Sequence, residues 1–406
     1  MIWHIINQLQ TRMDTRQNAM TLQIAFIGTG QIAGWHLSGL SELNRQTDGE
    51  PPYRLAALAD PRPEARERLA REAEEQTGQR PAVYADYREM LTRERLDAAS
   101  LLVPHHLHWD IARDCLDAGL HLQVQKPIAI TIGDGRRIID YSRAKNRALV
   151  VSEPSVLGRG TRAFFSALRA GALVGSPTFL LDYAVTTLGG GFFMGTPWRH
   201  LKGLAGAGWF LDHGVHRTHW FLEALGPVVE AFGMAKTFEP ERHDETHGTF
   251  SVDTEDCAMT ALRFAGGVLG HFLVASGGQG AGWGGVRLYG TDGVADLSGG
   301  TAQRNGQAAE RLDALTVPYQ DASIPTDAMA HSFNELHALA TAGKAPICSG
   351  ERALEALAVI YACLESSMTG RAVAVADILS GAAHEYEDTI EAARPLWSTI
   401  APASVS

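Results

Sequence analysis

The sequence predicts an α/β protein of two domains. In the first half of the chain, short apolar runs alternate with amphipathic helical stretches, which is the pattern of a parallel doubly wound sheet with helical crossovers. In the second half, longer segments of partly alternating polarity are joined by glycine turns, as in an antiparallel sheet. A chain of 406 residues with 45% hydrophobic content can bury more than one core, which also favours two domains.

The first domain opens with two strand-helix units. The apolar run LQIAFIG from Leu22 predicts a buried strand, and an amphipathic helix follows its glycines as far as Leu43. YRLAALAD, which ends at Asp60, predicts a second strand, and a charged helix that ends at Gly78 follows it. Two further predicted strands are AASLLV (98–103) and HLQVQ (121–125).

The second domain is predicted to combine an antiparallel sheet with helices. Its predicted strand segments are SPTFLLDYAV (176–185), CAMTALRFAGGVLGHFLVAS (257–276) and VRLYGTDGVADL (286–297). Its predicted helices cover 162–170, 331–343 and 350–370, and the last two end at a glycine. We predict an N-terminal extension over 1–20, a Rossmann dinucleotide-binding domain over 21–149, an α+β domain over 150–390 and a tail over 391–406.

The composition argues against several classes of function. A net charge of -11, without any run of Lys or Arg, is not typical of a nucleic-acid-binding protein. No apolar run reaches the roughly 18 residues that span a bilayer, and the first twenty residues lack the features of a signal peptide. Scattered cysteines predict reduced thiols and a cytoplasmic protein rather than disulfides or a zinc site; they are Cys115, Cys257, Cys348 and Cys363.

The stretch QIAFIGTGQIAGWH predicts the loop that seats a dinucleotide pyrophosphate. Gly28 would permit the tight turn and Gly30 the close approach of the backbone to the phosphates, while Ala33 takes the place of the third glycine. The helix that follows would offer free N–H groups and its positive end to the phosphates. The cofactor contacts predicted here are Gly28, Thr29, Gly30, Gln31 and Ile32.

An acid at the end of the second strand indicates which dinucleotide is bound. A carboxylate at Asp60 can accept hydrogen bonds from the ribose hydroxyls and would repel a 2′-phosphate, which favours NAD over NADP. Arg62 keeps NADP as the less favoured alternative. The other interpretation of Asp60 is a turn residue before Pro61.

Several later motifs resemble the family of glucose-fructose oxidoreductase, inositol dehydrogenase and MocA. These motifs are ADPRPEAR (59–66), VPHHLH (103–108), VQKPIA (124–129), GWFLDHGVHRTHWFLEALG (208–226) and GERALEALAVIYACLESSMTGRAV (350–373). The resemblance runs from about Thr21 to about Val375. It implies a Rossmann domain followed by a domain with a large, open, mostly antiparallel sheet that forms oligomer contacts, and hence a homodimer or homotetramer.

The resemblance also implies catalytic residues. Gln125-Lys126-Pro127 stands where the family has Glu-Lys-Pro, and in relatives the lysine contacts the reacting oxygen. Asp212 and His216 match the family's Asp-x-x-x-His. We expect His216 to accept the proton of the hydroxyl that is oxidised, because an imidazole titrates near neutral pH. On one helix, Asp212 would lie a turn before His216 and could orient its ring or bind substrate.

Three departures from the family pattern bear on the site. Gln125 removes a negative charge beside Lys126, His105 replaces the usual asparagine, and His219 stands where a second aspartate is common. The series His213, His216 and His219 could also be interpreted as metal ligands, although the family needs no metal and we expect none.

The predicted site includes further residues around this core. The remaining predicted cofactor contacts are Val103, Pro104, His106, His108, Gln125 and Lys126. The predicted substrate contacts are Lys126, Trp198, Arg199, Asp212, His213 and His216. Packing is the alternative role for Trp198, and the alternative for the histidines of VPHHLH is a solvated loop.

Three functions are compatible with these residues. The leading hypothesis is an NAD(P)-dependent oxidoreductase that transfers hydride between the nicotinamide and a secondary alcohol of a sugar, sugar derivative or cyclic polyol, with Lys126 and His216 as proton-transfer groups. The second is a redox-neutral glycosidase or eliminase that keeps NAD bound and oxidises the sugar transiently, as some members of the family do. The third is a sensor without catalysis.

Overall fold

The computed structural model describes residues 20–187, 196–244, 248–278, 282–316 and 324–398. Its first domain is built on a parallel sheet of six strands in the order β3-β2-β1-β4-β5-β6. The strands are β1 (Leu22–Ile27), β2 (Tyr53–Ala59), β3 (Ala82–Tyr84), β4 (Ala98–Leu101), β5 (His121–Gln125) and β6 (Leu149–Ser152). The chain order reverses beside β1, so the glycine loop after β1 and the end of β4 face each other across the switch point where such sheets bind ligands.

Helices cover both faces of this sheet. One face packs against α2 and α3, and the other against α4, α5 and α6. The helices are α2 (Gln31–Gln46), α3 (Pro63–Thr77), α4 (Tyr87–Arg93), η1 (His105–Leu107), α5 (His108–Asp117) and α6 (Ile132–Ala144). Because both faces are covered, the strands are apolar almost throughout, as the sequence predicted for a parallel sheet.

The second domain is built on a mixed sheet of nine strands in the order β16-β15-β14-β13-β7-β12-β11-β8-β17. Only β7 and β12 pair in parallel, and the other neighbours are antiparallel. Its strands are β7 (Pro177–Thr187), β8 (Val228–Lys236), β11 (Cys257–Phe264), β12 (Leu269–Gly278), β13 (Trp283–Gly290), β14 (Gly293–Asp296), β15 (Thr301–Arg304), β16 (Glu310–Arg311) and β17 (Val373–Ala374). A separate hairpin consists of β9 (Glu241–Asp244) and β10 (Gly248–Ser251).

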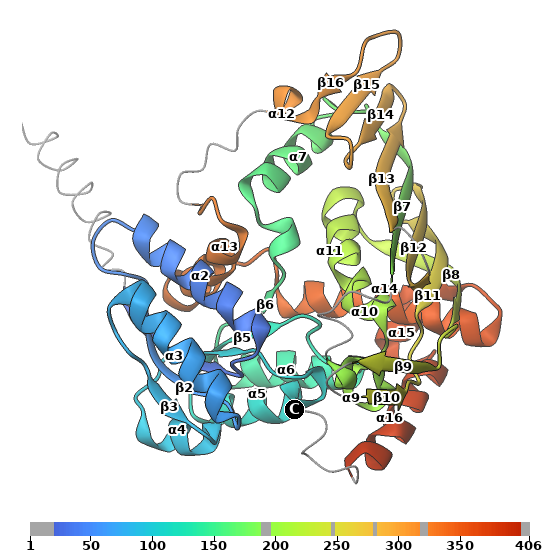
Figure 1. The fold of residues 1–406 in the computed structure, drawn as a ribbon. Coiled ribbons are helices and arrows are strands. Elements are labelled where there is room, and N and C mark those ends of the chain that lie inside the picture. Colours follow the sequence, from blue (N-terminus) through green and yellow to red (C-terminus); the bar gives the residue numbers. More distant parts are fainter. Residues whose placement is uncertain (1–19, 188–195, 245–247, 279–281, 317–323, 399–406) are drawn as a thin grey trace, which may run out of the picture.

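The second half of the chain also forms helices. They are η2 (Pro154–Val156), α7 (Arg159–Arg169), η3 (Pro197–His200), α9 (Lys202–Ala205), α10 (Trp209–Asp212), α11 (Gly214–Leu225), α12 (Leu312–Leu315), α13 (Ala328–Ala342), α14 (Gly350–Thr369), α15 (Val375–Ser380) and α16 (Glu385–Ser398). Of these, α10, α11 and α14 lie between the two sheets (Figure 1). α14 contacts β8 of the large sheet on one side and α6 of the Rossmann domain on the other. α13 returns to the first domain and packs on α2.

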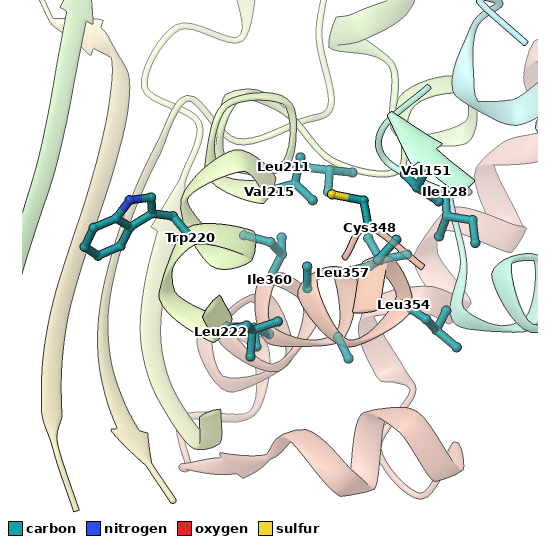
Figure 2. Close-up of a cluster of buried hydrophobic side chains, with 14 of the residues drawn as sticks. Ile128, Val151, Leu211, Val215, Trp220, Leu222, Cys348, Leu354, Leu357 and Ile360 are labelled. Atoms are coloured by element: carbon teal, nitrogen blue, oxygen red, sulfur yellow. The ribbon is translucent and has the colours of Figure 1, made fainter. Parts of the chain in front are cut away.

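A continuous apolar core joins the domains. Figure 2 shows Ile128 and Val151 of the Rossmann domain on the same side of α14 as Leu354, while Trp220 of α11 lies toward the large sheet. Ile360, near the middle of α14, is fully buried between them. The two domains therefore share one hydrophobic core, which fixes the position of α10 and α11 relative to the Rossmann sheet.

The predicted fold class is confirmed, with a parallel Rossmann sheet followed by a large, mostly antiparallel sheet. Helix ends differ from the predicted ones by a few residues, as at α7, because side-chain patterns place helix termini poorly. Residues 1–19 of the predicted extension and 399–406 of the predicted tail lie outside the described residues. Within the described ranges, no helix has the length and apolar character needed to cross a bilayer.

Candidate active site

The glycine loop after β1 has the geometry of a pyrophosphate cradle. Gly28 has φ +94, and a Cβ there would lie 2.4 Å from the Leu102 carbonyl oxygen, so only glycine fits. At Gly30, by contrast, a Cβ would have no neighbour closer than a guanidinium nitrogen of Arg62 at 3.8 Å, so space is open in front of the backbone. No side chain caps the N-terminus of α2, which begins with Gln31 and Ile32. These free N–H groups fit a dinucleotide diphosphate.

Asp60 lies beside this loop but is already hydrogen-bonded. One carboxylate oxygen accepts from the Thr29 amide at 2.8 Å and the other from the Arg62 amide at 2.9 Å, and the Arg62 guanidinium also contacts both oxygens. Burial acts to raise the pKa of Asp60, but these hydrogen bonds outweigh it and lower that pKa. Asp60 therefore stays anionic, and ribose hydroxyls would share it with Arg62.

A buried polar network lies under the loop. His36 of α2 is fully buried, with Nδ1 3.1 Å from Oε1 of Gln123 and Nε2 3.3 Å from Nε2 of Gln125. The amide of Gln125 can only donate to that ring nitrogen, so His36 carries its proton on Nδ1 and is neutral. Burial lowers the pKa of His36 to about 4. Gln125 thus stabilises a neutral histidine, and its Oε1 accepts from the Lys126 amide at 2.7 Å.

Lys126 and Arg199 both contact the carboxylate of Asp212. The Nζ of Lys126 donates to the Asp212 carboxylate at 3.1 Å and to the Asp212 carbonyl at 2.7 Å. Arg199 donates to the same carboxylate oxygen at 2.7 Å. Burial acts to raise the pKa of Asp212, but the charges of Lys126 and Arg199 outweigh it, so that pKa lies well below its usual range. Asp212 thus provides the carboxylate beside Lys126 that Gln125 cannot provide.

The expectation that Asp212 and His216 share one helix is wrong. Asp212 is the last residue of α10, and α11 begins at Gly214, so His213 lies at a break between them. A side chain added at Gly214 would lie 3.1 Å from Ile360, so the close approach of α11 to α14 places the second helix. Asp212 faces Lys126 and Arg199 instead of orienting the ring of His216.

His216 is held by a different carboxylate. Its Nδ1 lies 2.7 and 2.8 Å from the two oxygens of Glu153, which follows β6 and has no exposed surface. Burial acts to raise the pKa of Glu153, but the charge and hydrogen bond of His216 outweigh it, so that pKa lies well below its usual range. The side chain of His216 is itself 31% exposed, so the ring joins a buried anion to an accessible surface.

The aromatic residues of the predicted site surround Arg199 and Asp212. The Arg199 guanidinium lies 4.5 Å from the ring centroid of Trp198, and His105 packs edge-on against the same ring at 4.8 Å. His213 stacks on Trp209 at 5.3 Å, and burial lowers its pKa to about 4, so it is neutral near pH 7. Trp198 is 9% exposed, which shows that it packs as well as flanking the cluster.

The histidines of VPHHLH have different surroundings. His108 is buried, and its two ring nitrogens face the backbone carbonyls of Val103 and Ile128, so it braces the loop at Val103 and Pro104 and presents no free nitrogen to a cofactor. Burial lowers the pKa of His106 to about 4. His105 contacts the Ala205 carbonyl and packs against Trp198, so it is buried and not part of a solvated loop.

His219 is buried in α11, and neither of its ring nitrogens has a hydrogen-bond partner among the described residues. Burial lowers its pKa to about 4. In the part of the chain that is described, no group of three or more His, Cys, Asp or Glu side chains could hold a metal ion. The spacing of His213, His216 and His219 therefore does not create a shared coordination site, because their side chains face Trp209, Glu153 and the core, respectively.

Sequence reasoning missed Glu153, the partner of His216. Glu153 lies in VVSEPSV, directly after a strand of the parallel sheet, and the carboxyl ends of such strands form the ligand-binding edge. That position is a usable signal, because an acid directly after an apolar strand lies at the edge of the sheet where such folds bind ligands. Its partner is 63 residues away in the sequence, so the pairing itself could not be read from spacing.

Two family models match the chain. Residues 22–153 match the model of an oxidoreductase family with an NAD-binding Rossmann fold, and residues 181–296 match the C-terminal domain of the Gfo/Idh/MocA family. Together the matched segments include the glycine loop, the lysine motif and the Asp212/His216 segment.

Curated relatives match shorter parts of the chain. A glycosyl hydrolase family 109 protein of Streptomyces coelicolor is 28% identical over 37% of this chain and 31% of its own length. Inositol 2-dehydrogenase 1 of Saccharopolyspora erythraea is 29% identical over 32% of this chain and 36% of its own length. Levoglucosan dehydrogenase of Pseudarthrobacter phenanthrenivorans is 27% identical over 51% of this chain and 56% of its own length. The chain therefore spans from about a third to just over half of the length of these relatives.

Solved structures share the fold over most of the chain. Levoglucosan dehydrogenase in complex with NADH superposes with a TM-score of 0.74 and 20% identity, over 88% of this chain and 99% of that chain. An NAD-binding oxidoreductase of Klebsiella pneumoniae gives a TM-score of 0.72 and 20% identity, over 88% of this chain and 99% of that chain. The family models and the two-domain architecture agree: the chain belongs to the Gfo/Idh/MocA family of oxidoreductases, and its first domain is the NAD-binding Rossmann fold of that family.

Proposed function

We propose that this protein is an NAD-dependent oxidoreductase that transfers hydride between the nicotinamide and a secondary alcohol of a sugar, sugar derivative or cyclic polyol. The observation that carries the proposal is the placement of Lys126 and His216 on two separate buried carboxylates at the carboxyl edge of the Rossmann sheet. The substrate class rests on the named activities of two relatives, which are dehydrogenases of inositol and of levoglucosan.

NAD, when bound, supplies the hydride acceptor, and the protein supplies the proton chemistry. Gly28, Gly30 and the N-terminus of α2 would hold the diphosphate, with Asp60 near the adenosine ribose. NADP is the less favoured cofactor because Asp60 is anionic. Arg62, half exposed on that carboxylate, is the cation nearest to a 2′-phosphate.

Lys126 and His216 would divide the proton transfer. The Lys126 ammonium is held by Asp212 and can stabilise the developing negative charge on the substrate oxygen. His216 can accept the hydroxyl proton on the ring nitrogen that does not contact Glu153. Arg199 contacts Asp212 and Trp198, and His213 stacks on Trp209, so these side chains would position the ring of the substrate.

A redox-neutral glycosidase or eliminase is the second candidate. The observation that favours it is the match to a glycosyl hydrolase family 109 protein, which is 28% identical over 155 residues. Such an enzyme would use the same lysine and histidine but would return the hydride after loss of the aglycone. It would cleave a glycoside without net formation of NADH.

We also propose a homodimer or homotetramer, formed through the outer face of the large sheet. Six large apolar side chains share this face and are between 40% and 64% exposed; they are Phe179, Phe232, Met234, Met259, Leu269 and Trp283. α11 and α14 pack on the opposite face (Figure 1), so these side chains have no cover within the described chain.

A single series of measurements tests the activity. NAD binding is measured by titration calorimetry, and NAD reduction is then screened with pyranoses, 1,6-anhydrosugars and inositols. We expect binding of NAD and oxidation of at least one polyol, with kcat/KM lowered about a thousand-fold in Lys126→Ala because the charge on the reacting oxygen loses its stabiliser.

The matched control is Lys145→Ala, since Lys145 lies at the end of α6 and pairs with exposed Asp117. Cleavage of a nitrophenyl glycoside without NADH formation would select the second candidate. Full activity of Lys126→Ala would refute the assigned site.

A further inference from the structure

Glu153 is an isolated buried anion that contacts one imidazole. It follows β6, has no exposed surface, and its carboxylate accepts from the Ser155 amide at 3.1 Å and from Nδ1 of His216 at 2.7 Å. Among the described residues, no Lys or Arg side chain forms a salt bridge with this carboxylate, whereas Asp212 pairs with Lys126 and Arg199. A buried carboxylate is costly without hydrogen-bond donors, so His216 must present N–H on the side of Nδ1.

The other groups around Glu153 do not replace this contact. His219, on the same helix as His216, is neutral near pH 7 because burial lowers its pKa to about 4. The Cys348 thiol lies against the Glu153 backbone carbonyl, and burial raises the pKa of that thiol. Arg352 of α14 lies on the side of His219, and its side chain pairs with Glu355. His216 is therefore the side chain that supplies hydrogen bonds to the carboxylate.

The two nitrogens of His216 consequently have different roles. A neutral imidazole carries one proton, and the nitrogen that does not carry it has a lone pair. Since Nδ1 donates to Glu153, the lone pair is on Nε2, and the half-exposed ring can present it to a ligand. If the carboxylate were absent, the Nδ1–H and Nε2–H tautomers would both be populated, because no acceptor would stabilise the proton on Nδ1.

We propose that Glu153 is a positioning residue that fixes His216 in the Nδ1–H tautomer and makes Nε2 the proton acceptor of the oxidation. The inference rests on the proposed function. In the step it serves, the substrate O–H bond breaks and an Nε2–H bond forms, while the carbinol C–H bond breaks and its electron pair leaves as hydride to the oxidised nicotinamide. The imidazolium formed on His216 stays paired with Glu153, which keeps its own charge throughout.

The test uses Glu153→Gln in the full-length protein, because the amide keeps the shape of the side chain but removes its charge. We expect ring ¹⁵N NMR of the wild-type protein above pH 8 to show His216 protonated on Nδ1, and the variant to show a mixture of tautomers. We expect kcat/KM to fall about 100-fold, with little change in KM for substrate. Glu153→Asp should recover part of the loss, since it retains the charge.

Glu335→Gln is the matched control, because Glu335 is a buried glutamate that accepts hydrogen bonds from the amides of Ile347 and Cys348 and does not contact His216. It should keep the wild-type tautomer and kcat. A wild-type ring that carries its proton on Nε2 would overturn the proposal, whatever the activity. If no polyol is oxidised, the proposed function fails while the NMR result still decides the tautomer.

Discussion

Two buried carboxylates organise the candidate site, and they differ in the partners that neutralise them. Asp212 holds two cations, Lys126 and Arg199, whereas Glu153 holds one titratable imidazole, His216. In both cases burial acts to raise the pKa of the carboxyl, but the partner side chains lower that pKa by more. The difference lies in the chemistry of the partner, because an ammonium and a guanidinium only donate hydrogen bonds, whereas a neutral imidazole has one nitrogen that donates and one that accepts.

A third buried carboxylate shows the effect of burial where the described residues form no salt bridge to the carboxylate. Glu255 is 7% exposed and accepts a hydrogen bond from the Gly208 amide, just before α10. Burial raises the pKa of Glu255 to about 7, in contrast to Asp212 and Glu153. The comparison shows that the partners of the carboxyl group, and not burial alone, decide the direction in which its pKa is shifted.

The largest expected effect comes from removing the charge of Asp212. Asp212→Asn leaves Lys126 and Arg199 together in a site where their side chains are 12% and 13% exposed, so it should lower the free energy of unfolding by about 3 kcal/mol. Urea denaturation at pH 7 measures the loss. Asp140→Asn, at an exposed pair with Arg143, is the control and should change stability by less than about 0.5 kcal/mol. Equal stability of the two variants would contradict the role given to Asp212.

A smaller effect separates Glu255 from the site carboxylates. The pKa of Glu255 is raised in the folded protein, so the stability it contributes is fully present below its unfolded pKa of about 4.3 and is lost as pH rises through about 7. The free energy of unfolding of the wild-type protein should therefore decline between pH 5 and pH 8. In Glu255→Gln this decline should be smaller by about 2 kcal/mol. Urea denaturation across that range tests the slope, and an unchanged slope would show that Glu255 is ionised throughout.

The smallest expected effect concerns Gln125. A glutamate in its place would bring an anion to the buried ring of His36, whose pKa is now about 4. Gln125→Glu should raise the pKa of His36, because an adjacent anion favours the imidazolium, and should cost about 1 kcal/mol of stability at pH 7. The C2-proton NMR titration of His36 measures the shift. Gln123→Glu is the companion variant, since Gln123 contacts the other ring nitrogen.

Much of this protein could be predicted from its sequence alone. Local patterns predict the parallel sheet, because each βα unit is recognised by an apolar strand, a glycine turn and a helix end within a short stretch of chain. The glycine loop also follows from local sequence, since the close contact of Gly28 with Leu102 permits no side chain. Lys126, Asp212, His216, Trp198 and Arg199 were expected in the site, and the fold brings Lys126, Arg199 and Asp212 into direct contact.

Only the tertiary structure decided which charges pair. Four residues of spacing suggested that Asp212 orients His216, but a helix break at His213 turned Asp212 toward Lys126 and brought His216 to Glu153. That break is set by the packing of α11 against α14, which comes from a distant part of the chain. Periodicity carries information over a few residues, whereas the pairing of buried charges depends on which elements share a core. The sequence therefore determined the fold and the chemical groups, and long-range packing determined which carboxylate serves which base.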